Sequence, residues 1–210
     1  IINTFYSFFY IAWKESASKA VKKDNKNEFY NDIYINLKKF LIAVSIMILA
    51  ALPFVFNLLV NKNYQGGYIY IPILIVSILY SNLSSFCGGI FAAYKETKIM
   101  GTSTFYAAVI NIVVNIALIK FMGLWAAAIS TLASSFIVYV YRRIKMKKFL
   151  TLQKDKYIFY NILMFIFITL VYYSNNIFIY LFGFIICLIY SILLNIDMIK
   201  AILSKLKTRN

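Results

Sequence analysis

The sequence predicts an all-α integral membrane protein whose apolar helices form a multi-span bundle. Hydrophobic residues make up 62% of the 210 residues, and the mean hydropathy is +0.77, whereas a soluble domain is about half apolar. Much of the apolar content lies in runs of about 20 residues, which as helix can cross a hydrocarbon core of roughly 30 Å. Lysine and arginine gather between these runs.

The first 39 residues are expected to close one span and lead into another. Residues 1–13 are apolar and lack the basic start and cleavage site of a signal peptide. We therefore expect a partial span, and a chain that is the C-terminal part of a longer protein. Residues 14–39 are a charged connector, in which helical spacing of apolar residues predicts an amphipathic cytoplasmic segment along the membrane surface. These residues are Phe29, Ile33, Leu37 and Phe40.

Six complete spans are predicted within a single membrane domain, residues 1–210. Pro53 lies well inside the first of them and is expected to kink it. Pro72 lies in the first turn of the second, where proline is harmless. The spans are residues 40–60, 69–94, 101–119, 123–141, 157–174 and 177–196, with a basic loop at 142–156 and a basic cytoplasmic tail at 197–210.

The distribution of charge predicts an orientation. With these spans, all but two of the 22 lysines and arginines fall on one side of the membrane, together with all seven acids. Because basic residues collect in cytoplasmic loops, that side and the C-terminus are assigned to the cytoplasm. The same rule accounts for the formal charge of +15 without nucleic acid as a partner.

Composition argues against an enzyme. The chain has no histidine, and none of its seven acids lies inside a predicted span. Membrane hydrolases and transferases generally need histidine, paired carboxylates or a metal at the reacting centre. Cys87 and Cys187 lie in separate apolar runs and share no metal-ligand spacing. We therefore expect no catalytic residues, no cofactor and no metal.

Four polar residues in or beside the spans are candidates for substrate binding. Asn111 and Asn115 lie one turn apart and would either bind sugar hydroxyls in a polar cavity or hold helices together. Lys95 and Lys120 lie near span ends and would either meet an anionic head group or extend to the membrane surface. The polar residues 102–104 precede the asparagines near the cytoplasmic start of that helix, where capping is the expected role.

The order of several motifs resembles the C-terminal half of the polysaccharide and O-antigen repeat-unit flippases, which belong to the multidrug/oligosaccharidyl-lipid/polysaccharide exporter superfamily. The resemblance covers essentially the whole chain, and each motif alone is degenerate. In order, the motifs are Phe8-Phe9 with Ala12-Trp13, Pro53 before Leu58-Leu59 and Tyr64, Pro72-Ile73-Leu74, Lys95-Glu96-Thr97-Lys98, Asn111 with Asn115, and Gly123 before Ala127-Ala128 and Ser130-Thr131.

The resemblance implies a two-lobed fold of about fourteen helices, of which this chain would supply the end of the eighth and the last six. It implies a multi-pass transporter in the inner membrane of a bacterium. The transporter would flip an undecaprenyl-pyrophosphate-linked oligosaccharide to the outer leaflet by alternating access, for capsule, O-antigen or other lipopolysaccharide synthesis, beside a polymerase and other assembly proteins. A lipid II flippase or multidrug exporter of the same fold, or a non-catalytic membrane subunit of a polysaccharide assembly complex, are the alternatives.

Overall fold

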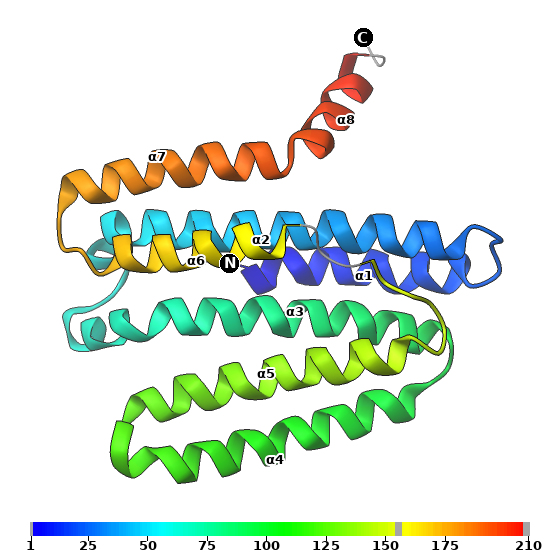
Figure 1. Ribbon diagram of the computed structural model, residues 1–210, viewed down its shortest axis with the longest axis horizontal. Coiled ribbons are helices and arrows are strands. Elements are labelled where there is room, and N and C mark those ends of the chain that lie inside the picture. The colour runs from blue at the N-terminus through cyan, green and yellow to red at the C-terminus, as the bar shows by residue number, and fades with distance from the viewer. Residues whose placement is uncertain (1, 154–156, 208–210) are drawn as a thin grey trace. The chain divides into compact units, whose positions relative to one another are not determined.

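The computed structural model describes residues 2–153 and 157–207, and all regular structure in this part of the chain is helical (Figure 1). The predicted all-helical class is therefore confirmed. In chain order the elements are α1 (Ile2–Ala20), α2 (Lys26–Leu59), the 3₁₀ helix η1 (Lys62–Tyr70), α3 (Ile71–Ala93), α4 (Thr97–Met122), α5 (Leu124–Met146), α6 (Ile158–Tyr172), α7 (Ile177–Leu194) and α8 (Ile196–Lys207).

Among the described residues, five helical segments are long and apolar enough to cross a membrane. They are α2, η1 with α3, α4, α5 and α7. The predicted span 157–174 contains α6, which is apolar but only 15 residues long. At 1.5 Å per residue α6 measures about 22 Å, which is shorter than a bilayer core of roughly 30 Å.

The chain divides into two compact units. Unit 1 contains residues 1–34 and 70–154, and unit 2 contains residues 35–69 and 155–210. The division falls within α2, whose first turns belong to unit 1. Helix α2 remains helical through Pro53, which removes the amide donor that the carbonyl of Leu49 would otherwise receive. Pro72 lies in the first turn of α3, as predicted.

Helix α3 is the centre of unit 1. It packs against α1 on one side and α5 on another, and α5 pairs with α4 in a hairpin that Figure 1 shows clearly. Trp13 fixes α1 to α3, because its indole Nε1 donates a hydrogen bond of 3.1 Å to the carbonyl of Phe86. The indole also stacks on the Phe86 ring at 4.3 Å. A Cβ on Gly89 would lie 2.5 Å from Nε1, so glycine provides the space that Trp13 fills.

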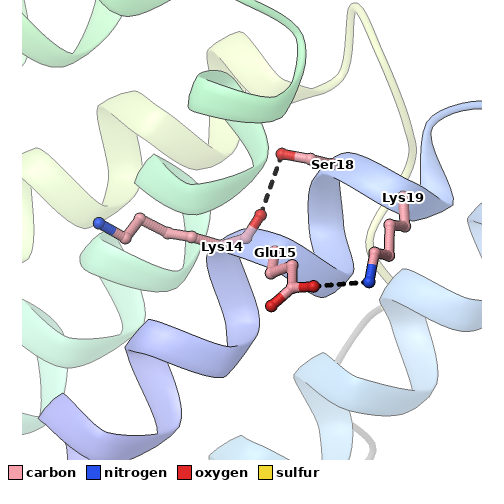
Figure 2. A network of polar contacts seen from close by, with 4 residues as sticks. All are labelled: Lys14, Glu15, Ser18 and Lys19. Carbon is pink, nitrogen blue, oxygen red and sulfur yellow. Dashed lines mark hydrogen bonds and ion pairs between the residues drawn. The ribbon is translucent and has the colours of Figure 1, made fainter.

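The connector predicted at 14–39 is almost entirely helical in the structure, since α1 runs to Ala20 and α2 begins at Lys26. On α1, Lys19 and Glu15 form an ion pair of 2.5 Å one turn apart (Figure 2). The hydrogen bond from Lys19, followed by its charge, lowers the pKa of the Glu15 carboxyl. Both side chains are well exposed, so this pair adds little to stability.

The inward face of α2 differs from the predicted stripe. Tyr30 and Tyr34 are buried, whereas Phe29 and Ile33 are only partly covered. The Tyr30 hydroxyl donates to the carbonyl of Ala17 at 2.8 Å, and the Tyr34 hydroxyl hydrogen-bonds that of Tyr139. Leu37 of the predicted stripe is buried. The tyrosines were not part of that stripe, because tyrosine is amphipathic and its burial depends on partners for the hydroxyl that are remote in the sequence.

Asn31 holds the segment after α5 against the start of α2. Its amide nitrogen donates to the carbonyl of Thr151 at 3.0 Å, and its amide oxygen accepts from the backbone N–H of Gln153 at 2.7 Å. Arg143 also bonds the Gln153 carbonyl, at 3.2 Å, and the Tyr139 hydroxyl. The described start of the basic loop is therefore fixed within unit 1 by side-chain hydrogen bonds.

In unit 2, aromatic residues tie η1 to the end of α6. The rings of Tyr68 and Tyr172 stack at 4.1 Å, and each hydroxyl donates to the other residue's carbonyl, at 3.2 and 2.9 Å. The Tyr173 hydroxyl donates to the carbonyl of Ile69 at 2.6 Å. Helix α7 packs against α6 where Gly183 meets Val171; a Cβ on Gly183 would lie 2.5 Å from the Val171 side chain.

Replacing Gly89 with alanine tests the contact that holds α1 to α3. The new Cβ would displace a rigid, buried indole, and overpacking of this kind costs about 1–3 kcal/mol. We expect Gly89→Ala to unfold at lower SDS concentration, with a red shift of tryptophan emission in the folded state. Gly101→Ala is the matched control, because Gly101 is also helical and nothing lies within 4 Å of its Cβ position. Equal stability of the two variants would contradict this packing.

Candidate functional site

Buried residues recur along the whole length of α5. They occur at every fourth position, so successive members are neighbours on the helix surface and the row winds slowly around the helix. The first three are small, so neighbouring backbones can approach closely. The row consists of Ala126, Ser130, Ser134, Val138, Arg142 and Met146. It therefore carries a cationic side chain into unit 1, one turn before α5 ends.

The guanidinium of Arg142 joins three helices of unit 1. Its Nε donates to the hydroxyl of Ser103 on α4 at 2.8 Å, and its Nη2 donates to the hydroxyl of Thr104 at 3.3 Å. Its Nη1 donates to Ser84 on α3, to the carbonyl at 3.0 Å and to the hydroxyl at 3.4 Å. Only 7% of Arg142 is exposed.

The hydroxyl groups of Ser103 and Thr104 on α4 are oriented by hydrogen bonds to the backbone. Ser103 and Thr104 each donate to the carbonyl of Met100, at 2.9 Å in both cases. Their hydroxyl hydrogens are thereby occupied, and their lone pairs face Arg142. The predicted capping role is wrong for these two residues, because Glu96 is the residue that precedes the first turn of α4.

All hydrogen-bond acceptors around Arg142 in the described part of the chain are neutral. They are three hydroxyls and one carbonyl, and no carboxylate pairs with the guanidinium there. Four of its five N–H groups are used, which leaves one on Nη2. A buried charge without a counter-charge is costly, so the position of Arg142 needs a reason other than stability.

Tyrosines of α1 lie near this cation. Gly88 leaves room for the guanidinium, since a Cβ there would lie 3.3 Å from Nη1 and 4.0 Å from the Tyr10 hydroxyl. Tyr6 stacks on Tyr10 with ring centroids 5.8 Å apart, and its hydroxyl is buried without a hydrogen-bond partner among the described residues. The Arg142 cluster, which we define as Arg142, Ser84, Ser103 and Thr104, is thus cationic and keeps one N–H of Nη2 without an acceptor among the described residues, a combination that suits an anion.

The predicted asparagines lie elsewhere on the α4–α5 hairpin. The Asn111 amide donates to the hydroxyl of Ser134 at 3.4 Å, a weak bond between α4 and α5. This contact is the interhelical one that the sequence left open as an alternative. Asn115 is half-buried and makes no side-chain hydrogen bond within the described residues. Ser134 lies on the same row of α5 as Arg142, two turns earlier.

The two predicted lysines lie at opposite ends of α4 and are exposed. Helix α4 has 26 residues and is about 39 Å long, so Lys95 and Lys120 cannot meet one ligand group. Lys120 lies in the last turn of α4, where a cation complements the helix dipole. The structure therefore brings neither lysine to the Arg142 cluster.

Lys95 has a backbone role. Its φ is +60°, its N–H bonds the carbonyl of Ala92 at 3.0 Å, and the N–H of Glu96 bonds that of Phe91 at 2.8 Å. These two bonds form the Schellman motif that ends α3, with Lys95 in the position that usually holds glycine.

The sequence analysis does not identify Arg142, because it places Arg142 and Arg143 at the start of the basic loop 142–156. In the structure, helix α5 continues to Met146. A signal was available: extending the four-residue period of Ala126, Ser130 and Ser134 reaches Arg142 and not Arg143.

The Arg142 cluster makes a prediction about stability. In Arg142→Met, the Ser103 and Thr104 hydroxyls keep their bonds to Met100 and no charge is buried, so we expect stability equal to or above that of the original chain. In Ser103→Ala, the cation loses an acceptor, and we expect a loss of about 1–3 kcal/mol. SDS unfolding monitored by tryptophan emission compares the two variants. A larger loss of stability in Arg142→Met than in Ser103→Ala would show that the arginine stabilises the fold.

The backbone of Lys95 makes a second prediction. Lys95→Gly removes the cost of the left-handed conformation and should raise stability by about 1 kcal/mol, whereas Lys95→Gln should leave it unchanged. Lys120→Gly is the control and should lower stability, since Lys120 is helical. Thermal unfolding in one detergent measures all three. A stability loss in Lys95→Gly would show that the side chain, not the backbone, matters at this position.

No family model, no curated protein and no solved structure matches this chain. The resemblance to the repeat-unit flippases therefore depends on the order of the sequence motifs alone. The structural basis for a proposal about function is the helical architecture and the Arg142 cluster.

Proposed function

We propose that this chain is part of a transporter that flips an undecaprenyl-pyrophosphate-linked oligosaccharide from the cytoplasmic to the outer leaflet of a bacterial inner membrane. The observation that carries the proposal is the Arg142 guanidinium, which is buried among apolar helices and whose partners among the described residues are all neutral. Ionisable residues in membrane helices are costly and are found mainly where they act on a substrate or ion.

The chemistry of the Arg142 cluster suits a phosphate-bearing head group. A guanidinium offers planar, paired donors that match phosphate oxygens. The remaining N–H on Nη2 is a donor that such an anion could use. An incoming anion would supply the counter-charge that Arg142 lacks, so binding energy would come from relief of an existing electrostatic cost.

The polar residues along the hairpin extend the proposal to sugars. Ser134 lies two turns before Arg142 on α5, and Asn111 of α4 donates to its hydroxyl. Amide and hydroxyl groups are the usual partners of sugar hydroxyls. In the proposed two-lobed fold of about fourteen helices, the second lobe would complete the cavity, and rocking of the lobes would expose it to each side in turn.

The same cation helps to rank the alternatives. A multidrug exporter of cationic compounds would gain nothing from an unpaired guanidinium, and a scaffold subunit of an assembly complex would need none. A lipid II flippase stays chemically equivalent, since its substrate also carries a pyrophosphate. The Arg142 cluster therefore favours an anionic lipid-linked substrate over the other two classes.

Complementation of a strain that lacks the complete gene tests the proposal. We expect Arg142→Met, in the full-length protein, to lower surface polysaccharide at least tenfold, as expected for loss of one charge-assisted hydrogen bond. Lipid-linked repeat units should accumulate on the cytoplasmic leaflet. Lys145→Met is the matched control, because Lys145 is an exposed cation on the same helix, and it should export normally.

Two results would overturn the proposal. Normal export by a well-expressed Arg142→Met variant would remove the role of the cation. Absence of lipid-linked units from the deletion strain would indicate a role in synthesis instead of flipping. Accumulation of lipid II in place of repeat units would assign the same mechanism to the lipid II flippase alternative.

A further inference from the structure

Helix α8 has an apolar face that the described residues do not cover. Ile202 and Leu203 are 53% and 59% exposed, and Ile196, two turns before Leu203 on the same face, is 37% exposed. The opposite side carries Asp197, Lys200 and Ser204. Twelve residues of helix measure about 18 Å, which is too short to span a bilayer. The helix is amphipathic and is not a continuation of a span.

A defined junction separates α8 from α7. Asn195 ends α7, and its amide donates to the carbonyls of Ser191 at 3.1 Å and Lys39 at 3.4 Å. Asp197, in the first turn of α8, forms an ion pair of 3.6 Å with Lys39. Figure 1 shows that α8 leaves this junction in a direction different from that of α7. Both contacts lie within unit 2, so the turn is fixed by unit 2 itself.

We propose that α8 lies in the surface of the bilayer and binds anionic lipid head groups. Its apolar face continues the exposed apolar surface at the end of α7, where Ile192 and Leu193 are 45% and 61% exposed. Helix α7 is apolar enough to cross a membrane, so the start of α8 is at the level where that membrane ends. A short amphipathic helix at this level inserts its apolar face at the boundary between head groups and acyl chains.

Charge complementarity selects the lipid. The sequence of α8 contains three lysines and one aspartate, and that aspartate is already paired with Lys39. The formal charge of α8 is therefore positive, and such a helix is attracted to the negative surface of phosphatidylglycerol-type lipids. A protein partner would have to match an equally basic rim, whereas the lipid surface supplies negative charge throughout. This inference does not depend on the flippase proposal.

The test uses the whole chain in lipid nanodiscs. Leu203→Cys and Ser204→Cys, in a background where Cys87 and Cys187 are replaced by alanine, are labelled with an environment-sensitive fluorophore. The two positions are about 100° apart around α8, with 203 on its apolar face and 204 on its polar face, so each is the control for the other. In discs of phosphatidylcholine with phosphatidylglycerol we expect blue-shifted emission and protection from iodide at position 203, and neither at position 204.

The lipid dependence tests the choice of partner. Relative to discs with phosphatidylglycerol, we expect a smaller blue shift at position 203 in discs of phosphatidylcholine alone. In a Lys200→Gln, Lys205→Gln, Lys207→Gln variant we expect the smaller shift in both kinds of disc. Equal iodide access at 203 and 204 would overturn surface binding. A shift that is as large in neutral discs would overturn the anionic selectivity. A shift that appears only when two copies occupy a disc would assign the face to self-association and would also overturn the proposal.

Discussion

The buried charge of Arg142 constrains unit 1 more than any other group does. A guanidinium removed from water needs acceptors in several directions, and α5 alone cannot provide them. Ser84 on α3 and the pair Ser103 and Thr104 on α4 provide them from two neighbouring helices. The three helices must therefore approach closely at one level. Gly88 on α3, which leaves space beside Nη1, and the small residues of the buried row on α5 make that approach possible.

Small residues and aromatic residues both pack the helices of unit 1. The buried row of α5 begins with alanine and serine, so backbones lie near one another and weak polar contacts become available. The α3–α5 contact also includes the Tyr80 ring, which lies 5.0 Å from that of Phe136 and 5.6 Å from that of Tyr139. The α1–α3 contact inserts Trp13 between Phe86 and Gly89.

The helical class and the approximate position of each long helix could be predicted from the sequence, because runs of apolar residues leave few alternatives in a membrane. The helix ends could not. Helix α5 continues through Arg142, whose guanidinium donates hydrogen bonds to acceptors on α3 and α4, and a sequence does not show such partners. Lys95 was read as a candidate for binding, although its conformation serves to end α3. Tyr30 and Tyr34 were missed as inward-facing residues since the partners of their hydroxyls are also remote in sequence.

The reciprocal pair of Tyr68 and Tyr172 has a consequence for the surrounding lipid. By closing α6 at Tyr172, the pair gives this helix a hydrophobic length of about 22 Å, some 8 Å below the thickness of a typical bilayer core. Such a mismatch is met by local thinning of the bilayer or by sinking of the aromatic ends. Helix α7 has 18 residues and measures about 27 Å. In a bilayer, lipids that contact α6 would therefore have to thin more than lipids that contact α7.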